Sequence, residues 1–282
     1  CGRERLLLAT SCVSVAGRFR MRALPRRARW LVPCVGCPPL FWGLAAMLLM
    51  AMAGLAWRVP LRQGPSVDPR GQTGSYAAVW RHPDFRKMVP LGFFNYGGLL
   101  AIQTLWAVPW MIRVASYTPV QAAQGLFWIN VAMLVTFWTW GLLNPWLARR
   151  GMDAQRLIAL GLPASLIMLA VIVGADAKLV EWSGLLLALF CMASTFVSLA
   201  QPAVGMAFPA ELAGRALSAY NLVIFSGVFA MQWGIGLLID GFRALGWTET
   251  NAFHGAMAIF LVFCIASYVY FLAAKSHNQG NN

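Results

Sequence analysis

FWGLAAMLLMAMAGLAW, the run at residues 41–57, contains no charged side chain and no polar group except the indole N–H of its tryptophans. Such a run is typical of a helix that crosses a bilayer, because the hydrocarbon core needs about 20 mostly apolar residues per helix. Further runs of the same character follow it along the chain. The sequence therefore predicts an all-α membrane protein with spans at residues 40–57, 88–110, 126–148, 157–174, 182–204, 217–239 and 255–274.

The composition agrees with this class and excludes most others. Of the 282 residues, 60% are hydrophobic and only 11% are charged. A soluble domain has about 25% charged residues, which it needs to cover a surface that faces water. The net charge of +13 could indicate a nucleic-acid partner, but the lysines and arginines lie between the apolar runs and form no single basic face. We therefore expect the lipid bilayer as a partner and no nucleic acid.

The spacing of the runs predicts how the chain is organised. A helix at 39–58 is followed by a polar linker at 59–87, a six-helix bundle at 88–275 and a tail at 276–282. Lysines and arginines are concentrated on the side of the linker and the tail, so these segments are expected in the cytoplasm. That side has Arg58, Arg62, Arg70, Arg81, Arg86, Lys87, Arg149, Arg150, Arg156, Arg215 and Lys275, and the opposite side has Arg113, Lys178 and Arg243. We expect a multi-pass protein of the bacterial inner (plasma) membrane.

Residues 1–38 do not follow this charge pattern. They form a basic, irregular segment with eight arginines, although the orientation places them opposite the cytoplasm. One interpretation is that the segment is not the natural lead-in to the first span, as a misread or truncated coding region would produce. The other is that Met21 to Ala53 resembles a signal sequence, with a basic region, an apolar region and a small-residue site. We favour the first interpretation.

Polar side chains inside the spans are the candidates for a binding site, because they are costly there. On a helical projection, those of the second, fifth and sixth spans fall into stripes, whereas the fourth and seventh spans have few. Four spans are therefore predicted to line a polar cavity and two to face lipid. The alternative is that each amide only bonds a neighbouring helix. The candidate cavity residues are Asn95, Gln103, Trp106, Asn130, Ser198, Gln201, Asn221 and Gln232.

Two segments between spans resemble a known family. GLLNPWLARRGMDAQRL at 141–157 and FPAELAGRALSAYN at 208–221 are similar to cytoplasmic loops in the C-terminal half of the major facilitator superfamily, and HPDFRKM at 82–88 is similar to the lead-in to its seventh helix. Arg149 departs from the pattern, since an acid is expected there. The residues that match the gating loops of the family are Gly141, Arg149, Arg150, Gly151, Arg156, Pro209, Glu211, Gly214 and Arg215.

The resemblance implies a fold of two six-helix bundles, with solute bound between them near the bilayer midplane. This chain would supply the C-terminal bundle and one preceding helix, and its partner would be a missing N-terminal half. It also implies that the second, third, fifth and sixth spans line the path. On this basis we expect transport of a small organic solute by alternating access, and we expect the chain to be inactive alone.

Two other functions compete with transport. A membrane-embedded enzyme, such as a lipid-modifying transferase, would need a reactive cluster, but His82, His254 and His277 are scattered. Cys34 and Cys37 form a lone CxxC pair without a second pair or a nearby histidine, so we expect no metal site and no cofactor. The third hypothesis is a non-functional fragment of a disrupted gene.

Overall fold

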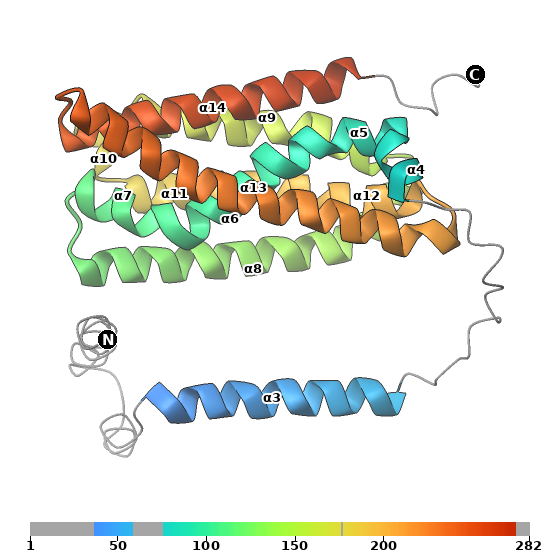
Figure 1. The fold of residues 1–282 in the computed structure, drawn as a ribbon. Coiled ribbons are helices and arrows are strands. Elements are labelled where there is room, and N and C mark those ends of the chain that lie inside the picture. The colour runs from blue at the N-terminus through green and yellow to red at the C-terminus, as the bar shows by residue number, and fades with distance from the viewer. Residues whose placement is uncertain (1–36, 59–75, 176, 275–282) are drawn as a thin grey trace. The chain divides into compact units, whose positions relative to one another are not determined.

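The computed structural model describes residues 37–58, 76–175 and 177–274, and within these ranges all regular structure is helical (Figure 1). The chain divides into two units, 1–72 and 73–282, which are described separately. The all-α class predicted from the sequence is confirmed. Most of the basic segment at 1–38, with Cys34 and the start of the signal-like stretch, lies outside the described residues, as do 59–75 of the linker and the tail at 276–282.

The first unit contributes one described helix, α3, at Cys37–Arg58. Its 22 residues span about 33 Å at 1.5 Å per residue, which is close to the thickness of the hydrocarbon core. Its apolar side chains are exposed, including Trp42 and Met50. The structure has a helix where the sequence analysis places the first span, and its passage through the bilayer remains a prediction.

The second unit contains six helices that are long and apolar enough to cross a membrane, at Pro83–Arg113, Pro119–Leu143, Ala154–Val173, Ser183–Met206, Ala210–Ala244 and Glu249–Ala273. They correspond to the second to seventh predicted spans. The unit therefore has the composition and helix lengths of a multi-pass integral membrane protein. Its elements are α4 (Tyr76–Arg81), α5 (Pro83–Pro90), η2 (Leu91–Tyr96), α6 (Gly97–Ala101), η3 (Ile102–Trp106), α7 (Ala107–Arg113), α8 (Pro119–Arg149), α9 (Ala154–Val173), α10 (Ala177–Val180), α11 (Ser183–Ser194), η4 (Thr195–Leu199), α12 (Ala200–Met206), α13 (Ala210–Ala244) and α14 (Glu249–Ala273).

The C-terminal end of the predicted linker, 59–87, contains helices. Helix α4 already begins at Tyr76, and α5 begins at Pro83 with Asp84 in its first turn. Both features favour a helix start, because proline has no N–H to leave unbonded and the carboxylate faces the positive end of the helix dipole. Val79 and Phe85 are fully buried, so this segment packs as part of the bundle.

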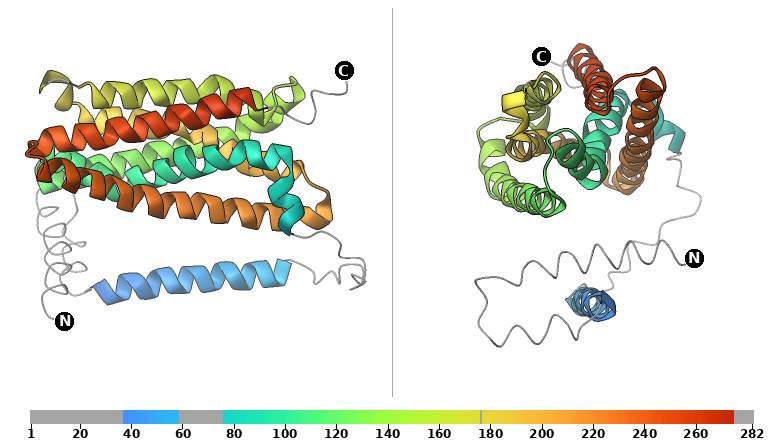
Figure 2. Two further views of the ribbon diagram at one scale, coloured as in Figure 1. Left: turned by 45° about the horizontal axis from the view of Figure 1, so that its top comes forward. Right: turned by 90° about the vertical axis from the view of Figure 1, so that its left-hand side faces the viewer.

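The helix at 83–113 lies in the middle of the bundle, where it packs against α13 and α14 (Figure 2). Glycines make this packing close. A Cβ atom at Gly97 would lie 2.7 Å from the backbone carbon of Gly227 on α13, and one at Gly98 would meet the ring of Phe260 on α14. Backbones that approach this closely gain dispersion contacts without needing a hydrophobic effect, which lipid does not provide. The glycines therefore determine where the central helix meets its neighbours.

Candidate functional site

The central helix contains two π-helical segments. Segments η2 (Leu91–Tyr96) and η3 (Ile102–Trp106) are π-helical, whereas α5, α6 and α7 are α-helical. A 3₁₀ segment, η4, interrupts the span at 183–206 in a similar way. Short π segments inside α-helices occur often at functional sites, because they widen the turn and redirect the side chains that follow. Segment η3 contains two of the residues predicted to line a cavity, Gln103 and Trp106.

The polar side chains of η3 reach both neighbouring helices. Gln103 Nε2 donates a hydrogen bond to Oδ1 of Asn130 on α8, at 2.9 Å. On the other side, Nε2 of Gln232 on α13 donates to Thr104 Oγ1, at 3.0 Å. The indole Nε1 of Trp106 donates to the main-chain oxygen of Gln232, at 3.2 Å. Asn130, Gln103, Thr104 and Gln232 thus form one row across three helices, which we call the polar row.

The polar row lies at the same depth on all three helices. Thr104, Asn130 and Gln232 are about 14, 17 and 18 Å from Arg113, Pro119 and Ala244 at 1.5 Å per residue. These three helix ends lie at one end of the bundle, where Arg113 also pairs with Glu249 of α14, at 3.6 Å. Because the hydrocarbon core is about 30 Å thick, the polar row lies near the middle of a spanning bundle.

The polar row is accessible at the surface of the bundle. Thr104 and Asn130 are exposed, and Gln103 and Gln232 are half-buried. In the end-on view of Figure 2, α8 and α13 lie on either side of the central helix. In an apolar 18-residue stretch of each helix, only 11% of the residues of α8 and 28% of those of α13 are buried within the chain, against 50% for the central helix. The face between α8 and α13 is therefore one part of the bundle where polar groups meet the surroundings.

The remaining candidates do not join the polar row. Gln201 on α12 donates a hydrogen bond to Asn221 on α13. This pair lies about 16 Å along α13 from Gln232. Ser198 Oγ donates to the main-chain oxygen of Thr195 within its own segment. Sequence reasoning missed Thr104, whose hydroxyl also donates to the Leu100 carbonyl and so presents its oxygen as an acceptor to Gln232.

Asn95 lies on a different side of the central helix, where its side chain is buried. Its Nδ2 atom donates to Oγ of Ser267 on α14, and the Cys264 carbonyl lies 3.4 Å from it. Helix α14 is one of the two spans predicted to face lipid. Asn95 therefore joins two packed helices, which is the alternative role that membrane amides often have.

Replacing Asn95 with alanine is expected to destabilise the bundle by about 1 kcal/mol, because a buried hydrogen bond from Asn95 to Ser267 is lost, while Ser267 still donates to the Cys264 carbonyl. The polar row should keep its geometry, since the Asn95 side chain does not reach it. Thermal unfolding of the purified protein measures the loss of stability. An unfolding temperature equal to that of the wild type would contradict the role of Asn95 in joining the two helices.

The first of the two segments that resemble family loops forms a tight turn between α8 and α9. Gly151 ends α8 in the left-handed region, with φ of 75°, and the Met152 N–H bonds the Leu147 carbonyl across it. Asp153 then caps α9 by accepting a hydrogen bond from the Arg156 N–H, at 2.8 Å. Glycine has no Cβ to oppose this conformation, so its place in the motif has a local structural reason.

Other residues of these two segments lie on helices or directly before one. Gly141 is inside α8, which continues to Arg149, and is therefore not a loop residue. Pro209 precedes α13 directly, and Glu211 lies in its first turn, where the helix dipole favours a carboxylate. Gly214 and Arg215 follow within the same helix. Arg150 lies over the Trp146 ring, with its guanidinium carbon 4.0 Å from the ring centre.

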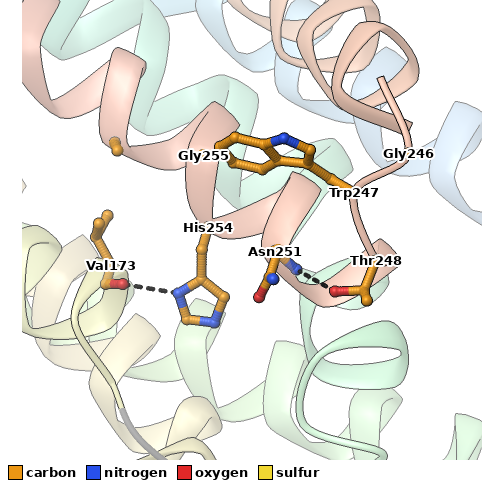
Figure 3. A pocket seen from close by; sticks show the side chains of 8 residues that line it. Val173, Gly246, Trp247, Thr248, Asn251, His254 and Gly255 are labelled. Atoms are coloured by element: carbon orange, nitrogen blue, oxygen red, sulfur yellow. Dashed lines mark hydrogen bonds between the residues drawn. The ribbon is translucent and has the colours of Figure 1, made fainter. Parts of the chain in front are cut away.

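A hollow of about 570 Å³ lies at the end of the bundle where α13 meets α14 (Figure 3). Trp247, Thr248, Asn251 and His254 line it, and His254 Nδ1 bonds the Val173 carbonyl at 2.7 Å. Glu249, which could have assisted His254 in an enzyme, pairs with Arg113 instead. Within the described part of the chain, no group of three histidine, cysteine, aspartate or glutamate side chains could hold a metal ion.

Comparisons with protein-family models, with curated proteins and with solved structures find no match for this chain. The interpretation of its function therefore depends on the residues and their geometry. Two observations matter most, the six apolar helices and the polar row that joins three of them.

Proposed function

We propose that this bundle is one half of a solute transporter of the major facilitator type, and that the polar row lines its solute path. The observation that supports this most strongly is the row itself, in which amide and hydroxyl groups of three helices meet at mid-depth on a π-helical segment. Substrate sites of secondary transporters lie near the bilayer midplane, at irregular segments of helices.

Packing alone is a weaker explanation for the polar row. Polar groups that only hold helices together become buried between them, as Asn95 is. Thr104 and Asn130 are exposed, and among the described residues the Oε1 atoms of Gln103 and Gln232 accept no hydrogen bond. Amide oxygens left unbonded against lipid would each cost several kcal/mol. A water-filled path, closed on its other side by a second helical bundle, removes that cost.

The charges of the central helix favour an uncharged solute. Between residues 88 and 112 the sequence has no aspartate, glutamate, lysine, arginine or histidine, and the same holds for 114–148 and 216–239. The basic side chains near the two ends of the central helix have other partners. Lys87 Nζ bonds Gln155 Oε1 and lies 4.9 Å from the centre of the Phe271 ring, and Arg113 pairs with Glu249. The polar row therefore has no counter-ion for a charged solute and no ionisable group for a proton relay.

Orientation and assembly complete the proposal. The excess of lysine and arginine on the side of Arg149, Arg150 and Arg215 supports a cytoplasmic location for that end of the bundle and for the C-terminus. The face between α8 and α13 would meet the second bundle across the path.

The function is tested in the cells that naturally make the protein, with the chromosomal copy deleted and replaced. Uptake from a mixture of metabolites is measured by mass spectrometry, so the solute need not be known beforehand. We expect at least one uncharged solute to enter with the wild-type protein and not with a Gln103→Ala, Gln232→Ala double variant. Gln124→Ala, an exposed glutamine of α8 outside the polar row, is the matched control. Identical uptake by the wild type and the double variant would contradict the proposal.

A further inference from the structure

Both glutamines of the polar row keep a hydrogen-bonding edge that the described residues do not use. Gln103 commits one amide hydrogen to Asn130, and Gln232 commits one to Thr104. A carboxamide has two donor hydrogens and one acceptor oxygen, so each side chain retains one donor and its Oε1 acceptor. These bonds also fix which way each amide faces, with its nitrogen toward the protein partner. Two donor–acceptor edges are thus held at one depth, on opposite sides of η3.

Asn130 also keeps one amide hydrogen that the described residues do not use. Its Nδ2 donates one hydrogen to the Leu126 carbonyl, at 2.8 Å, and its Oδ1 accepts from Gln103. The second amide hydrogen remains. The polar row therefore offers donors and acceptors together, and no full charge of either sign.

Exposed aromatic rings lie beside the polar row on both flanking helices. Phe127 precedes Asn130 by about one turn of α8 and is 60% exposed. Phe229 precedes Gln232 by about one turn of α13, is 68% exposed and stacks with Trp233 at 6.2 Å between ring centres. Because α8 and α13 run in opposite directions, one ring lies toward each end of the bundle. Apolar flat surfaces thus border the polar row above and below.

From this arrangement we infer that the polar row selects an uncharged polyhydroxylated solute, a small polyol or a monosaccharide. A hydroxyl both donates and accepts, so two neighbouring hydroxyls satisfy both halves of one carboxamide edge. The C–H faces of such a ring or chain pack on the phenylalanines, as apolar surface does on aromatic rings. An organic anion or cation would lose its hydration with no opposite charge to replace it. This inference rests on the transport function proposed above.

The test measures how solutes protect a cysteine placed beside the polar row. Leu105 is 46% exposed and follows Thr104 on η3, so Leu105→Cys adds a thiol there without removing a polar group. The background carries Cys1, Cys12, Cys34 and Cys37 as serine and keeps Cys191 and Cys264, which are buried. Membrane vesicles from the cells that make the protein are treated with a membrane-impermeant thiol reagent, with or without glucose, inositol, acetamide, lactate or choline.

We expect glucose or inositol to slow the modification of Leu105→Cys, and lactate and choline to leave its rate unchanged. Adding Gln103→Ala or Gln232→Ala should raise the half-protecting concentration roughly tenfold, because each removes a carboxamide edge. Gln124→Ala should leave that concentration unchanged.

Three outcomes would overturn the inference. Protection by lactate, choline or acetamide without protection by the polyols would assign a different solute class and leave the transport function standing. If the thiol at position 105 reacts and no polyol slows its reaction, the inferred solute class is also contradicted. A thiol at position 105 that does not react in any condition would contradict the water-filled path, and the transport function would then fail together with the inference.

Discussion

Alanine at position 227 is expected to prevent the bundle from packing as described. A Cβ atom there would collide with the main-chain oxygen, carbonyl carbon and Cα of Phe93 in η2, and the reciprocal atom at Gly97 would lie 2.7 Å from the Gly227 carbon. These neighbours are backbone atoms, so no side chain can rotate away, and α13 and the central helix must separate. Overpacking of a tight interior costs about 1–3 kcal/mol, and we expect the upper end of that range or more.

The matched control is Gly234→Ala on the same helix. Gly234 lies about two turns further along α13, and a Cβ atom there would meet none of the described atoms within 4 Å. Both variants are compared by thermal unfolding in detergent, followed by size-exclusion chromatography. The substitution, glycine to alanine, is the same in both. Gly227→Ala should unfold at a clearly lower temperature than the wild type, and Gly234→Ala should not. Equal unfolding temperatures for the two variants would contradict the close contact between α13 and η2.

The sequence predicts the spans well because long apolar runs have few alternatives in a chain this poor in charge. It cannot tell Gly227 from Gly234. Both are small residues on one face of α13, spaced so that either could meet a neighbouring helix. Only the packing shows that Gly227 meets the central helix. The same limit explains α4 and α5, since the burial of Val79 and Phe85 depends on contacts distant in the sequence.

Of the two amides that the sequence analysis places on one face of the central helix, Gln103 belongs to the polar row and Asn95 does not. A projection at 100° per residue groups Asn95 with Gln103 and Trp106, but it assumes an unbroken α-helix. Two π-helical segments, η2 and η3, alter the rotation between these positions. In the structure Asn95 bonds α14, while Gln103 bonds α8 and Thr104 bonds α13. Polar residues are visible in a sequence, but the π segments that orient them are not.

The α13 side of the polar row shows a second limit of the same kind. Gln232 was predicted from its own stripe with Asn221, whereas its partners in the structure are Thr104 and, through its main-chain oxygen, Trp106. Gly236 lies beside this indole, and a Cβ atom there would be in ordinary contact with the Trp106 ring, at 3.4 Å. A stripe on one helix identifies the face, and the neighbouring helices decide which of its residues meet.

The most direct test of a water-filled path compares two positions at similar depth, each replaced by cysteine in a separate variant that keeps the buried Cys191 and Cys264. Thr104→Cys lies on the polar row, and Val262→Cys lies on α14, where Val262 is 63% exposed on a surface expected to face lipid. Val262 is about 20 Å from the Glu249 end of its helix, against about 14 Å for Thr104 from Arg113. Both are placed in the background with the four N-terminal cysteines replaced by serine.

The rate of reaction with a membrane-impermeant thiol reagent is then measured in native membranes. The thiolate is the reactive form, and it exists only where water can solvate the charge. We predict that Thr104→Cys reacts on the order of a hundredfold faster than Val262→Cys. Equal, slow rates at both positions would show that the polar row faces lipid or packed protein, and would contradict the proposal that it lines a solute path.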